Sequence, residues 1–133
     1  MNPQLEAFDH IHVYVADRAA AARWYAEVLG LHPDPALSGW ATGHGPLTVC
    51  NADGSVHLAL FERAGQTGSA VVAFRVSAEG FLAWQAHLAA RSMDASAVDH
   101  EAAWSMYFRD PDGNGYEITC YDYAVLNARL AAV

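Results

Sequence analysis

The sequence is poor in three features that mark particular classes of protein: cysteine, basic side chains and long apolar runs. Two cysteines, Cys50 and Cys120, are too few for a disulfide framework, so we expect a reducing, cytoplasmic setting. Seven basic against fifteen acidic side chains give a formal net charge of -8, which argues against nucleic acid and anionic membranes as partners. No apolar run approaches the roughly 20 residues of a membrane span, and Met1 to Glu6 show no secretory-signal pattern.

What the sequence does contain is a repeat with an offset of about sixty residues. In the first half, Phe8 to Val15 alternates between apolar and polar residues, which predicts a strand. Asp17 is a suitable N-cap for a helix from Arg18 to Leu29, and Gly30 is a suitable end. The second half repeats this pattern, with a strand from Val71 to Val76, a cap at Ser77 and a helix from Glu79 to Ala90, so Ile11 aligns with Val72 and Val13 with Phe74.

The end of each half also repeats. Asn51-Ala-Asp-Gly54 and Asp110-Pro-Asp-Gly113 are Asp-Gly turns, and each precedes an alternating strand, Val56 to Phe61 or Tyr116 to Tyr121. Further strands are expected at 40–42, 47–50, 96–98 and 105–108, and the stretch Ala64 to Ser69 joins the halves. Each half therefore reads as a βαβββ unit, although two unrelated amphipathic segments could also resemble each other by chance.

The alternation assigns side chains to two faces of the predicted sheet. One face is apolar and suits a core that packs against the helices. The other face collects imidazoles, a carboxylate, a guanidinium and aromatic rings, among them His10, His57, Arg75 and Glu117. A face that was only solvated would carry more Lys, Glu, Ser and Thr, so this mixture indicates the lining of a cavity.

Three residues of that face form a possible metal site. We interpret His57 and Glu117 as equivalent positions of the two repeats, with His10 at the start of the first strand. Two imidazoles and one carboxylate are a ligand set for one divalent transition metal such as Fe, Mn, Ni, Co or Zn. The alternative is that each is a polar residue satisfied by a neighbour or by water.

Two segments resemble the vicinal-oxygen-chelate superfamily, which includes glyoxalases, bleomycin-resistance proteins and ring-cleaving dioxygenases. They are Asp9-His-Ile-His-Val-Tyr-Val-Ala-Asp17 with Arg23-Trp-Tyr-Ala-Glu-Val-Leu-Gly-Leu31, and Ser105-Met-Tyr-Phe-Arg-Asp-Pro-Asp-Gly-Asn-Gly-Tyr-Glu117. The resemblance implies an α+β fold in which two βαβββ repeats, about 5–63 and 70–123 of a single domain 1–133, form a cup-shaped mixed eight-stranded sheet with helices outside. It also implies one divalent metal that chelates neighbouring oxygens of a small molecule.

The resemblance places ligands at His10 in the first strand and Glu117 in the last. His57 lies where glyoxalase-like members have a Glu. Family enzymes often have His or Gln at the start of the fifth strand, whereas this sequence has Val71. Either His57 replaces the missing ligand, or the site binds metal weakly or not at all.

Four further residues are candidates for catalytic or substrate-binding roles. His12 and Tyr14 share the face of His10 and suit acid-base chemistry. Arg75 suits an anionic ligand or neutralises Glu117, and Tyr121 suits hydrogen bonding. Each has a purely structural alternative, such as packing in the cavity or at its rim.

The preferred function is a metal-dependent enzyme, either a glyoxalase-like lyase or isomerase or an extradiol-type dioxygenase, that acts on a small molecule with vicinal oxygens. The main alternative is a metal-free binding protein of the bleomycin-resistance type. In that protein Trp40, Phe61, Trp104 and Tyr107 would sandwich a flat ligand. The family and its open sheet edges also predict a homodimer.

Overall fold

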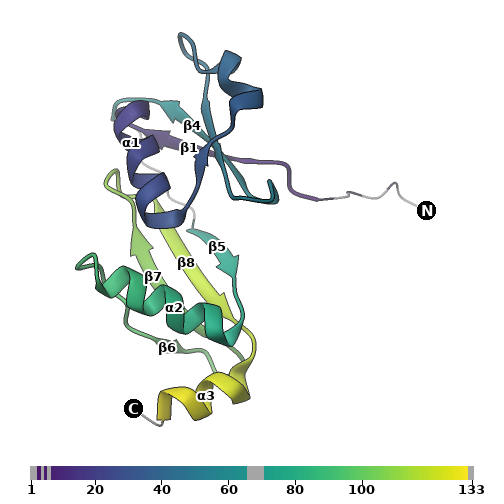
Figure 1. The fold of residues 1–133 in the computed structure, drawn as a ribbon, viewed down its shortest axis with the longest axis vertical. Helices are drawn as coiled ribbons and strands as arrows, with labels where there is room; N and C mark the ends of the chain where they lie inside the picture. Colours follow the sequence, from purple (N-terminus) through teal and green to yellow (C-terminus); the bar gives the residue numbers. More distant parts are fainter. Residues whose placement is uncertain (1–2, 4, 6, 66–70, 132–133) are drawn as a thin grey trace. The chain divides into compact units, whose positions relative to one another are not determined.

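The structure is a computed structural model that describes residues 3, 5, 7–65 and 71–131. The chain divides into two compact units, residues 1–68 and 69–133, which we call unit 1 and unit 2 and describe one at a time (Figure 1). Most of the predicted connection from Ala64 to Ser69 lies outside the described residues.

Unit 1 contains one four-stranded mixed sheet. Its elements are β1 (Ile11–Val15), α1 (Arg18–Trp24), η1 (Tyr25–Leu29), β2 (His32–Pro33), η2 (Pro35–Trp40), β3 (Leu47–Cys50) and β4 (His57–Glu62). The strand order is β1-β4-β3-β2, with β1 parallel to β4 and the other neighbours antiparallel. The sheet therefore brings the first and last strands of the unit side by side.

Local signals account for most boundaries in unit 1. The Asp17 carboxylate accepts a hydrogen bond from the Ala20 N–H at 3.0 Å, which caps α1 as predicted. The helix continues as the wider turn η1 and ends at Gly30, whose φ of 68° favours glycine. The strand predicted at 40–42 is wrong, because Asp34 caps Ala36 at 3.0 Å and Pro35 starts the 3-10 helix η2 instead.

Unit 2 repeats the arrangement. Its elements are β5 (Val71–Arg75), α2 (Ala78–Ala89), β6 (Val98–Asp99), β7 (Trp104–Arg109), β8 (Gly115–Cys120) and α3 (Tyr123–Ala131). The strand order is β5-β8-β7-β6, again with one parallel pair, β5 and β8. The predicted cap is confirmed, since the Ser77 hydroxyl accepts from the Gly80 N–H at 3.1 Å. The helix α3 had no counterpart in the sequence prediction.

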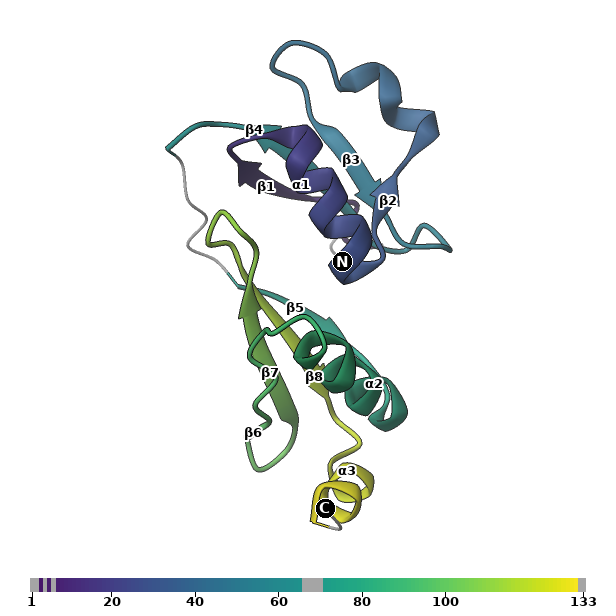
Figure 2. The same ribbon diagram turned by 60° about the vertical axis from the view of Figure 1, so that its left-hand side comes forward.

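In each unit the helix covers one face of the sheet and the core lies between them (Figure 2). The alternation predicted this: Leu58 and Leu60 are fully buried in unit 1, as are Ile118 and Cys120 in unit 2. The α+β fold with two βαβββ repeats is confirmed, and the eight strands of the described residues form two sheets of four. Among the helices of the described residues, none is long and apolar enough to cross a membrane.

Candidate functional site

A cavity of about 220 Å³ lies in unit 1 over the sheet face that carries the predicted imidazoles. The residues just before β1, strands β3 and β4, and η2 with the turn that follows it supply its lining. The lining residues are Asp9, His10, Leu37, Trp40, Pro46, Thr48, His57, Ala59 and Phe61. This volume lies below the roughly 300–1,000 Å³ typical of pockets for drug-sized ligands, so the cavity suits a small molecule.

The cavity depends on a tight turn after η2. A side chain at Gly45 would place its Cβ 1.9 Å from the Trp40 carbonyl oxygen, so only glycine fits there without a backbone shift. The Arg18 guanidinium donates to the Gly45 carbonyl and ties this turn to α1. Trp40 itself is 59% exposed, and its ring is available to a ligand at the cavity edge.

His10, just before β1, and His12, in β1, lie next to each other. Their Nε2 atoms are 3.1 Å apart and their rings stack with centroids 5.0 Å apart. The Nδ1 atom of His10 is 2.7 Å from a carboxylate oxygen of Asp9. Two imidazole nitrogens at this separation fit neighbouring positions on one ion with metal–nitrogen bonds of about 2.0–2.1 Å. A carboxylate on the far ring nitrogen is the usual way to orient a metal-binding histidine.

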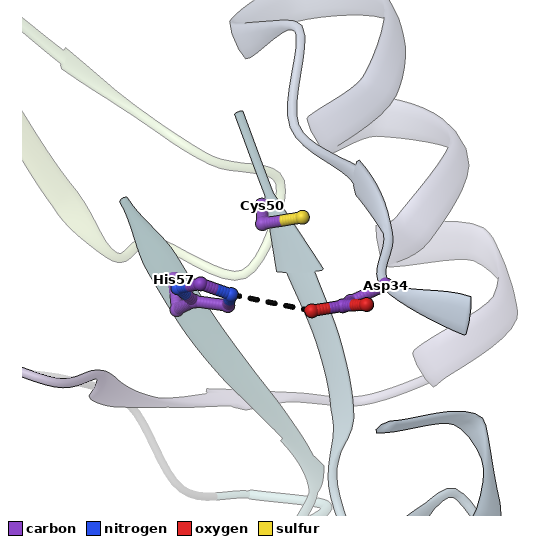
Figure 3. Close-up of side chains that lie close together, drawn as sticks. All are labelled: Asp34, Cys50 and His57. Atoms are coloured by element: carbon purple, nitrogen blue, oxygen red, sulfur yellow. Dashed lines mark hydrogen bonds and ion pairs between the residues drawn. The ribbon is translucent and has the colours of Figure 1, made fainter. Parts of the chain in front are cut away.

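His57 has different neighbours from those predicted. Its Nε2 is 3.3 Å from the Asp34 Oδ2, and Cys50 lies beside it (Figure 3). One donor atom from each of the three residues lies within 4.8 Å of the other two. Burial and, to a lesser degree, the Asp34 carboxylate raise the pKa of the Cys50 thiol.

The strand register shows that His57 and Glu117 are not equivalent positions. Ile11 pairs with Leu58 in unit 1, and its counterpart Val72 pairs with Tyr116 in unit 2. Leu58 therefore corresponds to Tyr116, and Ala59 is the counterpart of Glu117. The predicted equivalence is wrong by two residues, about 7 Å along the strand. The assignment of His57 as a metal ligand stays a prediction, but it loses this support.

Glu117 in unit 2 belongs to a hydrogen-bonded group on β7 and β8. The buried Ser105 hydroxyl contacts the Glu117 Oε2 at 2.7 Å and the Thr119 Oγ1 at 3.1 Å. Tyr107 lies directly across from Glu117 in the register, and its hydroxyl is 2.9 Å from the His100 Nε2. Partial burial of the phenol and the Glu117 carboxylate raise the pKa of Tyr107.

The fifth-strand position of unit 2 has no metal donor. Val71 is 54% exposed and lines a recess of about 130 Å³ together with Tyr107, Phe108, Arg109, Gly115 and Tyr116. At this position, where family enzymes often have His or Gln, the chain therefore has an apolar side chain and no imidazole.

The remaining predicted residues lie in separate places. Tyr14 is half-buried on β1 with its ring 6.3 Å from that of Phe61. Arg75 is exposed on β5 opposite Thr119. In the part of the chain that the structure describes, no ion pair joins Arg75 to Glu117. Tyr121 is 65% exposed just after β8.

Sequence reasoning did not identify Asp34 and Cys50 as neighbours of His57. A signal was present for one of them, because Cys50 and His57 flank the predicted hairpin turn and form a cross-strand pair. Asp34 had no such signal, since the residues around it were not expected to form η2.

Comparison with known proteins gives a consistent result for the fold. A family model described as "Glyoxalase/Bleomycin resistance protein/Dioxygenase superfamily" matches residues 7–118. None of the curated proteins compared with the chain matches it.

Among solved structures, an integron cassette protein from the mobile metagenome of the Halifax Harbour sewage outfall has a TM-score of 0.73 at 20% identity, covering 87% of this chain and 99% of its own. An oxidase named ChaP-H1 has a TM-score of 0.68 at 25% identity, with coverages of 90% and 98%. The fosfomycin resistance protein FosX from Listeria monocytogenes, complexed with Mn(II) and sulfate, has a TM-score of 0.65 at 13% identity, with coverages of 96% and 99%.

Proposed function

Because the chain belongs to the glyoxalase/bleomycin resistance protein/dioxygenase superfamily, we propose that it is a metal-dependent enzyme acting on a small molecule with adjacent oxygen atoms. The observation that carries the proposal is the His10–His12 pair, with Nε2 atoms 3.1 Å apart, where His10 lines the unit 1 cavity. The proposal also includes a homodimer and a reducing, cytoplasmic setting, which rest on the family resemblance and on the two free cysteines.

The proposed ligands are His10, His12 and Glu117. His10 and His12 are supported by their separation and by the Asp9 contact, and Glu117 is included on the closing motif alone. The Nε2 of His57, the third ligand expected from the sequence, lies beside Asp34, whereas the Nε2 of His12 lies beside that of His10, so we propose His12 in that place. A bound divalent ion would supply Lewis acidity and stabilise negative charge that develops on a substrate oxygen.

The other residues of unit 1 have roles that follow from their contacts. Asp9 holds the His10 ring in one orientation through Nδ1. Leu37, Trp40 and Phe61 give the cavity apolar walls that exclude water from a bound ligand. Tyr14 lies near the Phe61 ring and is proposed, as in the sequence analysis, as a hydrogen-bonding or acid-base group.

Arg75 and Tyr121 in unit 2 are proposed to bind polar groups of the substrate. Arg75 is exposed and free of an ion pair with Glu117 among the described residues, so its guanidinium is available to an anionic group. Two of the structural neighbours support the enzyme proposal by their names, one as an oxidase and the other as a Mn(II) complex.

A metal-free binding protein is the second candidate, and the placement of Trp40 and Phe61 on the same cavity favours it. Two aromatic rings can hold a flat ligand by stacking. Trp104 is not proposed to stack on such a ligand, because its indole N–H donates to Asn127 at 2.7 Å and its ring stacks on Tyr123.

The test is elemental analysis and isothermal titration of untagged protein with Mn²⁺, Fe²⁺, Co²⁺, Ni²⁺ and Zn²⁺. We expect close to one Mn²⁺ per chain, lost in H10A and weakened at least about tenfold in H12A and E117Q. H87A is the matched control, since His87 lies on α2 and contacts Arg91 and Trp84 of the same helix region. H57A should keep Mn²⁺ if His12 is the third ligand. Absence of Mn²⁺ binding, or Mn²⁺ binding that H10A and H12A leave unchanged, would overturn the enzyme proposal and favour the flat-ligand alternative.

A further inference from the structure

Asp34, Cys50 and His57 form a three-residue cluster at the end of the β3–β4 hairpin (Figure 3). Cys50 is the last residue of β3, His57 is the first of β4, and the two are a cross-strand pair. Asp34 follows β2 and reaches the same place from the neighbouring edge of the sheet. The chain thus brings a thiol, an imidazole and a carboxylate together from three segments.

Backbone contacts fix the position of the carboxylate. The Asp34 N–H donates to the Thr48 carbonyl at 2.9 Å, which holds Asp34 against β3. Its Oδ1 accepts from the Ala36 N–H, so the other oxygen, Oδ2, is the one directed at His57. All three residues are only partly exposed, with side-chain exposures of 20% for Asp34 and 23% for His57. The cluster is therefore both ordered by the fold and open to small solutes.

We propose that Asp34, Cys50 and His57 bind a thiophilic divalent ion of the zinc class, separately from the ligands His10, His12 and Glu117. Sulfur, nitrogen and oxygen donors in this combination suit Zn²⁺ and Co²⁺ and disfavour Mn²⁺ and Mg²⁺. Three protein ligands leave a fourth position for water or a ligand. The inference does not depend on the proposed function, and it gives His57 a role outside the proposed Mn²⁺ site.

The geometry requires only a small closing movement. The three donor atoms lie within 4.8 Å of one another. Bonds of about 2.0–2.3 Å around a tetrahedral ion would set them roughly 3.3–3.8 Å apart. Side-chain rotations that move the donor atoms by about 1 Å would close this gap. The strand pairing would stay unchanged. His57 also lines the 220 Å³ cavity, so an ion held here has its open position within reach of a bound molecule.

The test is titration of the full-length, reduced protein with Co²⁺, followed by absorbance spectroscopy. A thiolate bound to Co²⁺ gives a sulfur-to-metal charge-transfer band in the near ultraviolet, which a purely structural cysteine does not give. We expect this band in the wild type, loss of it in C50S, and a decrease in Co²⁺ affinity of at least about tenfold in D34N and H57A. Addition of Zn²⁺ should remove the band by displacing Co²⁺.

Two controls keep the result interpretable. C120A removes the other thiol, which is buried in the core of unit 2, and it should keep the band. The H10A/H12A double variant should also keep it while losing Mn²⁺ binding, so the two proposals fail independently. A band that persists in C50S, or no band at saturating Co²⁺ with circular dichroism showing an intact fold, overturns the inference.

Discussion

The sheet faces opposite the helices differ between the two units although the units share one topology. In unit 1 the register positions Thr48 and Ala59 carry small side chains, and the space above them is a cavity. Their counterparts in unit 2 are the larger side chains Tyr107 and Glu117, which lie across from each other, and Glu117 accepts from the Ser105 hydroxyl. The two units therefore differ both at this cross-strand pair and in η2, which lines the unit 1 cavity and has no counterpart among the described residues of unit 2.

The hairpin turns of the two units also differ, in the burial and hydrogen bonding of their first residue. Asp110 in unit 2 is buried and accepts hydrogen bonds from the N–H groups of Asp112 and Asn114 and from the Asn114 side chain. Asn51 in unit 1 is half-buried, accepts from the Val56 N–H and donates to Ser55. The Asp110 carboxylate thus accepts three hydrogen bonds from a buried position, whereas the Asn51 side chain makes two from a half-buried one.

The largest effect is expected from removing the turn carboxylate of unit 2. D110A leaves three donors without their acceptor in a buried place, so it should lower the free energy of unfolding by about 2–4 kcal/mol. N51A, the matched variant in unit 1, should cost about 1 kcal/mol because its neighbours reach water. Urea denaturation of both variants measures the difference. Equal losses would show that the two turns are equally important.

A second experiment makes unit 1 resemble unit 2. Because Ala59 is the register counterpart of Glu117 and pairs with His12, A59E adds a carboxylate next to the His10–His12 pair. We expect Mn²⁺ to bind about tenfold more tightly, which corresponds to about 1.4 kcal/mol. A59Q has nearly the same size without the charge and should bring no gain. Isothermal titration of the two variants decides, and an equal gain in both would remove the register argument.

The repeat, the helix caps and both hairpins could be predicted because each depends on local chemistry. Asp17 and Ser77 cap helices through contacts three residues away, and the Asp-Gly turns set the ends of the strands. The register between strands that are far apart in the sequence does not depend on such local contacts, so it could not be predicted from them. The hairpin of unit 1 has one more residue between Gly54 and β4 than the hairpin of unit 2 has between Gly113 and β8.

The sequence alignment had assumed the opposite difference, with strands starting at Val56 and Tyr116, and the two one-residue differences add up to the two-residue error in the predicted site. A shift of two residues keeps every side chain on the same face, so alternation cannot detect it. In the sequence alignment Glu117 was matched with His57, whereas its counterpart in the strand register is Ala59. The Asp34 contact was also beyond prediction, because it depends on η2 replacing the expected strand.

A smaller effect should come from the hydroxyl that supports Glu117. Ser105 is fully buried and contacts both Glu117 and Thr119, so S105A should lower the free energy of unfolding by about 1 kcal/mol. S55A removes a hydroxyl that bonds to Asn51 in the exposed turn of unit 1 and should change stability by less than about 0.5 kcal/mol. Thermal denaturation compares the two, and a neutral S105A would mean that the polar cluster of unit 2 adds no stability.

The smallest effect concerns the titration of Tyr107, which has no counterpart in unit 1 because Thr48 occupies its position. Burial comes first and the Glu117 charge second among the causes that raise its pKa. The folded protein therefore holds the phenol proton more tightly than the unfolded chain. This contribution to stability is present below the unfolded pKa of about 10 and is lost as pH rises through the folded pKa.

Since the chain has six tyrosines, the tyrosinate absorbance of Y107F must be subtracted from that of the wild type to isolate this group. The difference titration should have its midpoint above the ordinary tyrosine pKa. In an E117Q background the midpoint should fall yet stay above that value, because burial remains when the charge is removed. An unchanged midpoint in E117Q would mean that the carboxylate does not act on the phenol. The polar face of unit 2 would then be a set of local hydrogen bonds instead of an electrostatically coupled group, and its contrast with the unit 1 cavity would be one of packing alone.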